Sequence, residues 1–334
     1  MACISRVLVG LITAGLASLA QAGVVPAEVA ADAEAGYFRR ALARVEPLVA
    51  THAEDAEVQF RHAEALIGVG RPDEAIPKLE ALIARNPENG AYHRMLGAAH
   101  QRKMEAVFAA NPGLGAMMRM RKMLKDTLAE LETAARLAPD DVEARVMLAS
   151  IYLEAPGFMG GDVDKALAQA EALERLDRVA ALKVRASAAA HEDDVDESAA
   201  LYARADALDK TAGSLVALGV MYVGNERYDD ALRTFRAATE KDPDAPAPWY
   251  QIGRVAALSG TALDEGVAGL TRYLAFEMRP DALPSAGWAH LRLGNIHAHA
   301  KRIDAARAAF RAAAVHAQRE PDLVRKLEEA EDDL

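Results

Sequence analysis

The sequence predicts an all-α protein: an α-solenoid of about eight helix-turn-helix units that ends in a C-terminal capping helix. Two observations carry this prediction. Small and large residues recur in segment 214–243 at the offsets of two interlocking helices, and related segments follow at a spacing near 34 residues. The composition agrees, because hydrophobic residues make up 51% of the 334-residue chain but aromatic residues only 5%. Ala, Leu and Val therefore dominate, as in closely packed helices.

The segment 214–243, SLVALGVMYVGNERYDDALRTFRAATEKDP, is the most regular unit. Counted from Gly219, small or large residues lie at offsets of +3, +12, +16, +19 and +24, which are Tyr222, Ala231, Phe235, Ala238 and Pro243. The small residues let two helices approach, the large ones fill the space between them, and the proline ends the second helix. One unit cannot bury its own apolar face, so the pattern predicts further units.

The same offsets recur on both sides of this unit. The predicted units start near residues 22, 56, 90, 142, 179, 212, 246 and 287. Two interruptions break the period: an insertion of about 18 residues, covering about 102–125, and a Gly-rich turn at 155–162. The solenoid is expected to span 23–320, and the charged segment 321–334 is expected to cap its exposed face.

This spacing resembles the tetratricopeptide-repeat (TPR) family over nearly all of the chain after residue 22. The segment that runs from Met147 through the turn APGFMGG is also similar to bacterial exported TPR proteins of undefined activity. The resemblance implies a right-handed superhelix. It also implies a concave groove that binds peptides or other proteins.

The first 22 residues have the pattern of a secretory signal peptide. MACISR precedes the apolar run VLVGLITAGLASLA, and Ala20-Gln21-Ala22 places small residues where a signal peptidase cleaves. We expect cleavage after Ala22 and periplasmic localisation, with secretion from the cell or an uncleaved anchor as alternatives. Cys3 is the only cysteine, so the mature chain would have no disulfide and no thiolate nucleophile. Cleavage would also remove the apolar run, so we expect no transmembrane span in the mature chain.

The charge balance constrains the class of partner. The chain has 39 Lys and Arg against 50 Asp and Glu, a net charge of -11, which argues against a nucleic-acid partner. The sequence has no HExxH, GxSxG or similar catalytic pattern in a plausible setting. We therefore expect a non-enzymatic protein without a cofactor, whose partner is a protein or peptide of the cell envelope.

In the TPR family, the first helix of each unit lines the groove at its second, fifth, ninth and twelfth positions. The groove residues predicted in this way are Phe60, Ile67, Val216, Val220, Tyr250, Arg254, Trp288, Leu291 and Asn295. A mainly apolar lining suits a peptide with hydrophobic anchors. The alternative is that the same residues pack against neighbouring helices. The lining lacks the Lys and Asn pattern of chaperone-binding TPR domains, so a chaperone C-terminus is not the expected ligand.

The insertion has an unusual composition, with five of the 11 methionines and several basic residues in an acidic chain. Methionine surfaces adapt to apolar partners and nearby cations attract anions, so Met117, Met118, Arg119 and Arg121 are candidates for a partner or membrane-surface contact. Two alternatives remain open. The insertion could form a hairpin over the groove with its turn at 111–113, or a lid that closes a small-molecule cavity.

Two other features favour structural roles. The Gly-rich turn lacks the Gly-Lys-Ser/Thr ending of a phosphate loop, and Asp162 is better placed to cap the following helix. Calcium binding by Glu154, Asp162 and Asp164 is disfavoured, because the ligand spacing of a calcium loop is absent. His290 and His297 share a helix face at positions of packing residues, so we expect packing there and no metal site.

Overall fold

The computed structural model describes residues 24–110, 114–277, 280–281, 283–317 and 320–334, apart from the side chains of 108–110 and 114–118. Every regular element in these ranges is helical. The predicted signal peptide at 1–22 and the predicted turn at 111–113 lie outside the described residues. Within them, no helix is both long and apolar enough to span a membrane.

The helices form eight consecutive pairs, each made of a first and a second helix in contact, followed by one further helix. The pairs are α1 (Ala27–Glu34) and α2 (Phe38–Val49); α3 (Ala56–Gly68) and α4 (Pro72–Arg85); α5 (Gly90–Ala110) and α6 (Leu114–Leu137); α7 (Val142–Glu154) and α8 (Val163–Leu173); α9 (Arg178–His191) and α10 (Val195–Asp206); α11 (Gly213–Gly224) and α12 (Tyr228–Lys241); α13 (Pro246–Ser259) and α14 (Leu263–Ala275); and α15 (Ala286–His299) and α16 (Ile303–Ala314). A short 3₁₀ turn, η1 (Gly157–Met159), lies between α7 and α8, and α17 (Pro321–Asp332) follows the last pair.

In four of the pairs, a glycine on the first helix lies against a large residue on the second: Gly97 with Leu131, Gly219 with Phe235, Gly253 with Leu270 and Gly294 with Phe310. A Cβ atom at Gly219 would lie 2.4 Å from the Phe235 ring, and one at Gly294 would lie 2.1 Å from the Phe310 ring. Both phenylalanine side chains are buried. The helices can approach this closely only because the glycines have no side chain, which explains the spacing of small and large residues in the sequence.

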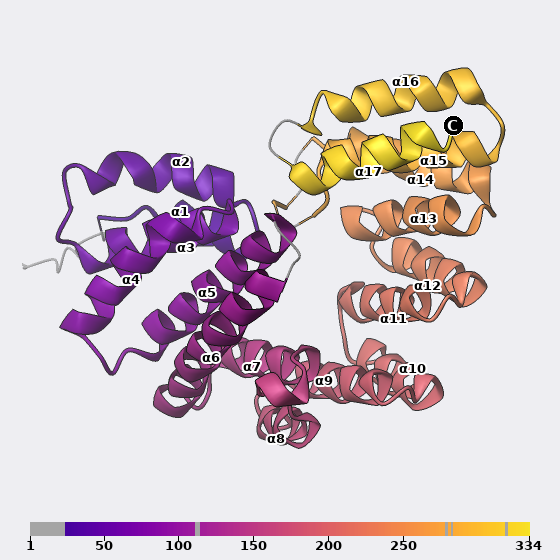
Figure 1. Ribbon diagram of the computed structural model, residues 1–334. Coiled ribbons are helices and arrows are strands. Elements are labelled where there is room, and N and C mark those ends of the chain that lie inside the picture. The colour runs from indigo at the N-terminus through magenta and orange to yellow at the C-terminus, as the bar shows by residue number, and fades with distance from the viewer. Residues whose placement is uncertain (1–23, 111–113, 278–279, 282, 318–319) are drawn as a thin grey trace, which may run out of the picture.

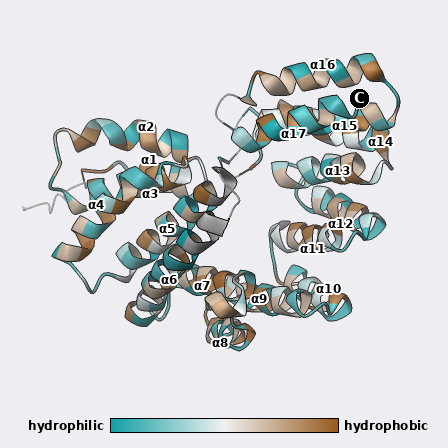
Figure 2. Ribbon diagram, viewed as in Figure 1, coloured by the Kyte–Doolittle hydropathy of each residue, from teal (hydrophilic) through white to brown (hydrophobic). Residues whose placement is uncertain are grey.

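The pairs stack into a solenoid with an inner layer of first helices. These helices contact the next first helix at most junctions, while each second helix contacts the first helix that follows it. Figure 1 shows the pairs following one another around an arc, and Figure 2 shows hydrophilic and hydrophobic residues mixed along most helices, as amphipathic packing requires. The predicted insertion at 102–125 does not form a separate element; it lengthens α5 to 21 residues and α6 to 24.

Local caps explain where several helices begin. The Asp162 side chain accepts a hydrogen bond from the Lys165 amide at 3.0 Å, as the sequence predicts, and so caps α8. Asp55, Asp141 and Asp177 cap α3, α7 and α9 in the same way. Each carboxylate satisfies an amide that has no partner within its helix and lies at the positive end of the helix dipole.

The two ends of the arc also meet. Helix α17 contacts α5 of the long hairpin. The connection between α14 and α15 contacts the turn between α1 and α2, where the Asp281 amide donates to the Gly36 carbonyl oxygen at 2.8 Å. The first and last parts of the solenoid are therefore in direct contact, and in Figure 1 they approach each other across the arc.

Candidate functional site

The nine residues predicted for the groove fall into two groups. Phe60, Ile67, Tyr250 and Leu291 are buried, with exposed fractions between 1% and 8%. The Tyr250 ring, for example, lies 5.2 Å from the ring of Tyr273 between centroids. These four pack between helices, as the packing alternative describes. The other five, which are half-buried or exposed, are Val216, Val220, Arg254, Trp288 and Asn295.

A cleft of about 710 Å³ opens where α13, α15 and α17 come together. Trp288, Leu291 and Asn295 all line this cleft. They lie on one face of α15 because residues three, four and seven apart share a helix face. The structure therefore brings together the three groove residues predicted in the last unit, and we call this space the inner cleft.

Two parts of the lining of the inner cleft are not predicted from the sequence. Arg292 lines it from α15, and Lys326 and Glu329 line it from α17. Arg292 follows Trp288 by four residues, so helical spacing alone could have indicated it. The wall from α17 has no comparable local signal. Its position depends on how the apolar side of α17 packs against α15 and α16.

Among the described residues, neither Arg292, which lines this cleft, nor Arg254 of α13 pairs with a carboxylate. The Arg254 guanidinium donates to the Gln251 side chain at 3.2 Å. Burial and the positive charge of Arg292 both lower the pKa of Arg254. The Nε atom of Arg292 is buried and, among the described residues, has no hydrogen-bond partner. An acceptor such as a carboxylate or carbonyl oxygen would stabilise such half-buried guanidinium groups.

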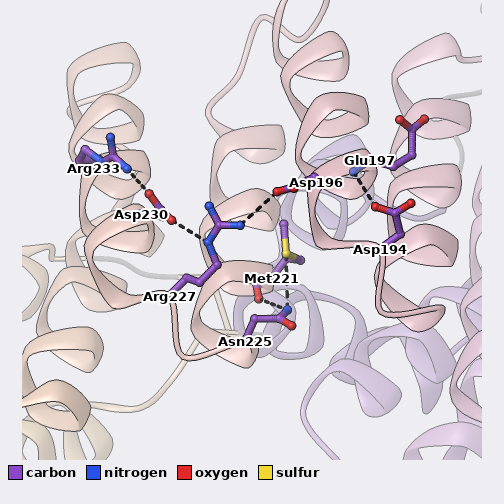
Figure 3. A network of polar contacts seen from close by, with 8 residues as sticks. All are labelled: Asp194, Asp196, Glu197, Met221, Asn225, Arg227, Asp230 and Arg233. Carbon is purple, nitrogen blue, oxygen red and sulfur yellow. Dashed lines mark hydrogen bonds and ion pairs between the residues drawn. The ribbon is translucent and has the colours of Figure 1, made fainter.

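In the turn between α11 and α12 of the sixth unit, by contrast, the arginine is paired with carboxylates (Figure 3). Arg227 donates to Asp230 at 2.7 Å and to Asp196 of α10 at 3.4 Å, and its guanidinium lies 4.8 Å from the ring centroid of Tyr222. Arg233 also pairs with Asp230. A cavity of about 380 Å³ adjoins this network. These charges neutralise one another and link α10, α11 and α12, and as largely exposed pairs they contribute little to stability.

On α15, His290 and His297 are half-buried and His299 is exposed. The His290 ring stacks on that of His316, with centroids 6.2 Å apart. Burial is the main cause that lowers the pKa of both His290 and His297. The Nε2 atom of His299 lies 3.1 Å from the Ala257 carbonyl oxygen, at the inner cleft. In the described part of the chain, no group of three or more His, Cys, Asp or Glu could hold a metal ion.

The insertion contact predicted on the long hairpin is only partly described. Arg119 and Arg121 are exposed on α6, whereas the side chains of Met117 and Met118 lie outside the described residues. Met104 of α5 packs against the apolar cluster formed by α6 to α9. The hairpin therefore contributes to the core of the solenoid along part of its length.

Sequence comparison identifies the repeats. The tetratricopeptide repeat family model matches residues 60–106 and 216–282. These segments run from within α3 into α5 and from within α11 past the end of α14. No curated protein sequence matches the chain significantly.

Structural comparison finds similar chains among solved structures. One chain of a human IFIT1 dimer with m7Gppp-AAAA is 16% identical; the match covers 84% of this chain and 65% of IFIT1, with a TM-score of 0.54. A tetratricopeptide repeat protein from Parabacteroides merdae is 15% identical over 82% of this chain and 98% of its own, with a TM-score of 0.48. A chain of the APC/C hetero-tetramer Cut9-Hcn1 is 14% identical over 90% and 55%, with a TM-score of 0.48. This chain thus spans less than two thirds of the IFIT1 and Cut9-Hcn1 chains. At such identities, the likeness to IFIT1 shows the α-solenoid fold alone.

Proposed function

Because this chain belongs to the tetratricopeptide-repeat family, we propose that it is a non-catalytic scaffold that binds a peptide segment of a partner protein on its inner face. TPR solenoids are protein-interaction scaffolds, since stacked helix pairs present an extended concave surface. The excess of acidic residues, 50 against 39 basic ones, favours a protein over a nucleic acid as partner. The fold alone does not choose a ligand, so the finer proposal rests on the inner cleft.

The observation that carries the proposal is the juxtaposition of Trp288, Arg292 and Asn295 in a cleft of about 710 Å³. A hydrophobic side chain of the peptide would bury against Trp288. The peptide backbone or an adjacent carboxylate would accept hydrogen bonds from Asn295, Arg292 and the nearby Arg254. Aromatic and arginine side chains at the centre of an interface commonly supply most of its binding energy.

A second candidate is a solute-binding solenoid in which the long hairpin closes a small-molecule cavity. Two observations favour it. The volume of the inner cleft falls within the range of about 300–1,000 Å³ that small-molecule sites occupy. In addition, α5 of the hairpin contacts α17, the helix that forms one wall of the cleft.

We further propose that the protein is exported and that its partner belongs to the cell envelope. The signal pattern at 1–22 supports this, with the periplasm as the expected compartment and secretion as the alternative. Mass measurement of the protein from its native cells should show an N-terminus at Gly23. A protein that retains residues 1–22 would contradict cleavage.

The binding proposal is tested by capture from envelope extract, followed by titration of each captured protein in purified form. Trp288→Ala and Asn295→Ala should each weaken binding at least about tenfold, because both remove groups that line the cleft. Trp249→Ala is the matched control. Its indole donates to the Pro243 carbonyl oxygen at 3.1 Å, outside the inner cleft. Unchanged affinity in both cleft variants would overturn the proposal.

The same variants separate the two candidates. Mass spectrometry of the protein denatured after purification would reveal a bound solute, which Trp288→Ala should release. A solute lost in this variant, together with no peptide binding, would favour the solute-binding alternative.

A further inference from the structure

The two ends of the solenoid are joined by a contact that the repeat pattern does not require. Asp281, between α14 and α15, donates its amide hydrogen to the Gly36 carbonyl oxygen at 2.8 Å. Its carboxylate accepts from the Arg39 amide at 2.9 Å and lies 3.0 Å from the Arg39 guanidinium. These partners are 242 residues apart in the sequence.

This contact caps α2 from another unit. Helix α2 begins at Phe38, and its own N-cap residue, Tyr37, makes no side-chain capping hydrogen bond. Arg39 lies in the first turn, where amides have no partner within the helix and a carboxylate is favoured by the helix dipole. Asp281 therefore does for α2 what Asp55 does locally for α3. Its side chain is only 9% exposed.

Two equivalent turns show that the contact is specific to the first unit. Gly36, between α1 and α2, and Gly70, between α3 and α4, have nearly equal φ angles of +77° and +78°. A Cβ atom at Gly36 would lie 3.1 Å from Cβ of Pro280, whereas nothing among the described residues lies within 4 Å of one at Gly70. The first turn is thus covered by residues 280–281, and the next turn is open.

We propose that residues 280–281 form a clasp that closes the solenoid end to end, and that release of the clasp opens the inner face to a partner. The clasp consists of a few polar contacts and the approach of Pro280 to Gly36, and besides it the main contact between helices of the two ends, among the described residues, is that of α17 with α5. The clasp can therefore open while the helix pairs stay folded. Helix α15, which carries Trp288, begins at Ala286, only five residues after Asp281. Movement of the clasp therefore reaches the inner cleft directly. This coupling rests on the proposed function, but the closure itself does not.

Disulfide cross-linking tests the closure. Gly36→Cys with Pro280→Cys, in a Cys3→Ser background that removes the chain's only cysteine, should cross-link on oxidation. A disulfide needs Cβ atoms about 3.5–4.5 Å apart, close to the observed separation. Gly70→Cys with Pro280→Cys is the matched control and should stay reduced. Absence of the cross-link in a Gly36→Cys, Pro280→Cys protein with native helicity would overturn the clasp.

A second test avoids any strain at Gly36. Asp281→Ala should speed hydrogen exchange of the Arg39 amide roughly tenfold, as expected for loss of one capping hydrogen bond. It should also increase the radius of gyration measured by X-ray scattering. Asp264→Ala is the control, since it removes an Asp264–Arg302 pair of 3.2 Å that does not join the two ends. Unchanged exchange at Arg39 would overturn the capping role of Asp281.

The coupling to binding is tested separately, with the cross-linked protein. If the clasp must open for entry, oxidised Gly36→Cys, Pro280→Cys protein should bind the captured partner more slowly than the same protein after reduction. Equal association rates would remove the coupling and leave the closure intact. Loss of binding in Trp288→Ala is independent of this result and still reports on the cleft.

Discussion

The sixth unit (α11 and α12) and the last unit (α15 and α16) have the same glycine–phenylalanine contact, the lock, between their helices. They differ in the partners of their arginine side chains. Gly219 faces Phe235 in one and Gly294 faces Phe310 in the other, at almost the same distance. Yet Arg227 at the edge of the sixth unit has two carboxylates and an aromatic ring as partners. In contrast, the Nε atom of Arg292 in the last unit is buried and, within the described ranges, has no partner.

This difference separates residues that hold the scaffold from residues that are free to bind. Paired charges on the edge network already satisfy one another, so they offer little to a ligand. An unpaired, half-buried guanidinium lowers the stability of the free protein, and such destabilised positions often mark binding sites. The repeat pattern thus constrains the helix lock and leaves the inner surface free to differ between units.

The largest expected effect concerns the lock, where the two units should behave alike. Phe235→Ala and Phe310→Ala should each lower the free energy of unfolding by about 3–5 kcal/mol, because each leaves a cavity in a buried contact. Denaturant titration measures this loss. Phe158→Ala, at a side chain that is 70% exposed, should change it by less than about 0.5 kcal/mol. Clearly unequal losses at Phe235 and Phe310 would break the comparison.

Replacing Arg292 and replacing Arg227 should change the stability of the protein in opposite directions. Arg292→Met should raise the free energy of unfolding by about 1 kcal/mol, because it replaces a half-buried guanidinium, whose Nε atom has no partner among the described residues, with an apolar side chain of similar length. Arg227→Met should lower the melting temperature, because Asp196 and Asp230 lose a shared partner. Thermal unfolding followed by circular dichroism distinguishes the two. Destabilisation by both substitutions would show that Arg292 is also structural.

At the start of the sixth unit, Asp209 should make stability sensitive to strong acid. Burial would raise its pKa, but hydrogen bonds from Ser214 and Thr211 outweigh this and lower it to about 2. The unfolded chain then binds more protons than the folded one between pH 4 and 2. The contribution of Asp209, about 2 kcal/mol for this lowering of its pKa, is complete above about pH 4 and lost as the pH falls toward 2. Asp209→Asn should remove this pH dependence; an unchanged acid titration would contradict it.

The smallest expected effect is a loss of stability near pH 6 that affects the last unit and not the sixth. Burial lowers the folded-state pKa of His290 and His297, so the unfolded chain binds more protons below its ordinary histidine pKa of about 6.5. Stability of the last unit is complete above that pH and decreases as the pH falls below it. The sixth unit, residues 212–245, has no histidine.

Hydrogen exchange of α15 and α11 at pH 7.5 and 5.5 measures the two units separately. Protection of α15 should fall at the lower pH while that of α11 is retained, after correction for the intrinsic exchange rate. His290→Gln with His297→Gln should remove the difference. Equal loss in both helices would show that the histidines do not cause it.

Residue spacing predicted the helix pairs well because each pair is a local structure. The lock between Gly219 and Phe235 depends on residues 16 positions apart, so its signature is visible in a short segment. The inner surface was harder to predict. Tyr250 and Arg254 occupy groove positions of the same helix, yet Tyr250 is buried against Tyr273 while Arg254 is half-buried. How far the next helix covers each position depends on the rotation between pairs, which no single unit specifies.

The sequence by itself determined the repeated pair, its lock, the approximate limits of the units and the helix cap at Asp162. These features arise from contacts between residues close in the chain, where helical periodicity and capping chemistry act directly. Only the tertiary structure decided that α17 forms a wall of the inner cleft, that the buried Nε atom of Arg292 has no partner among the described residues, and that Asp281 caps α2. The physical reason is that small rotations add up from pair to pair along a solenoid. Contacts between its distant parts depend on their sum.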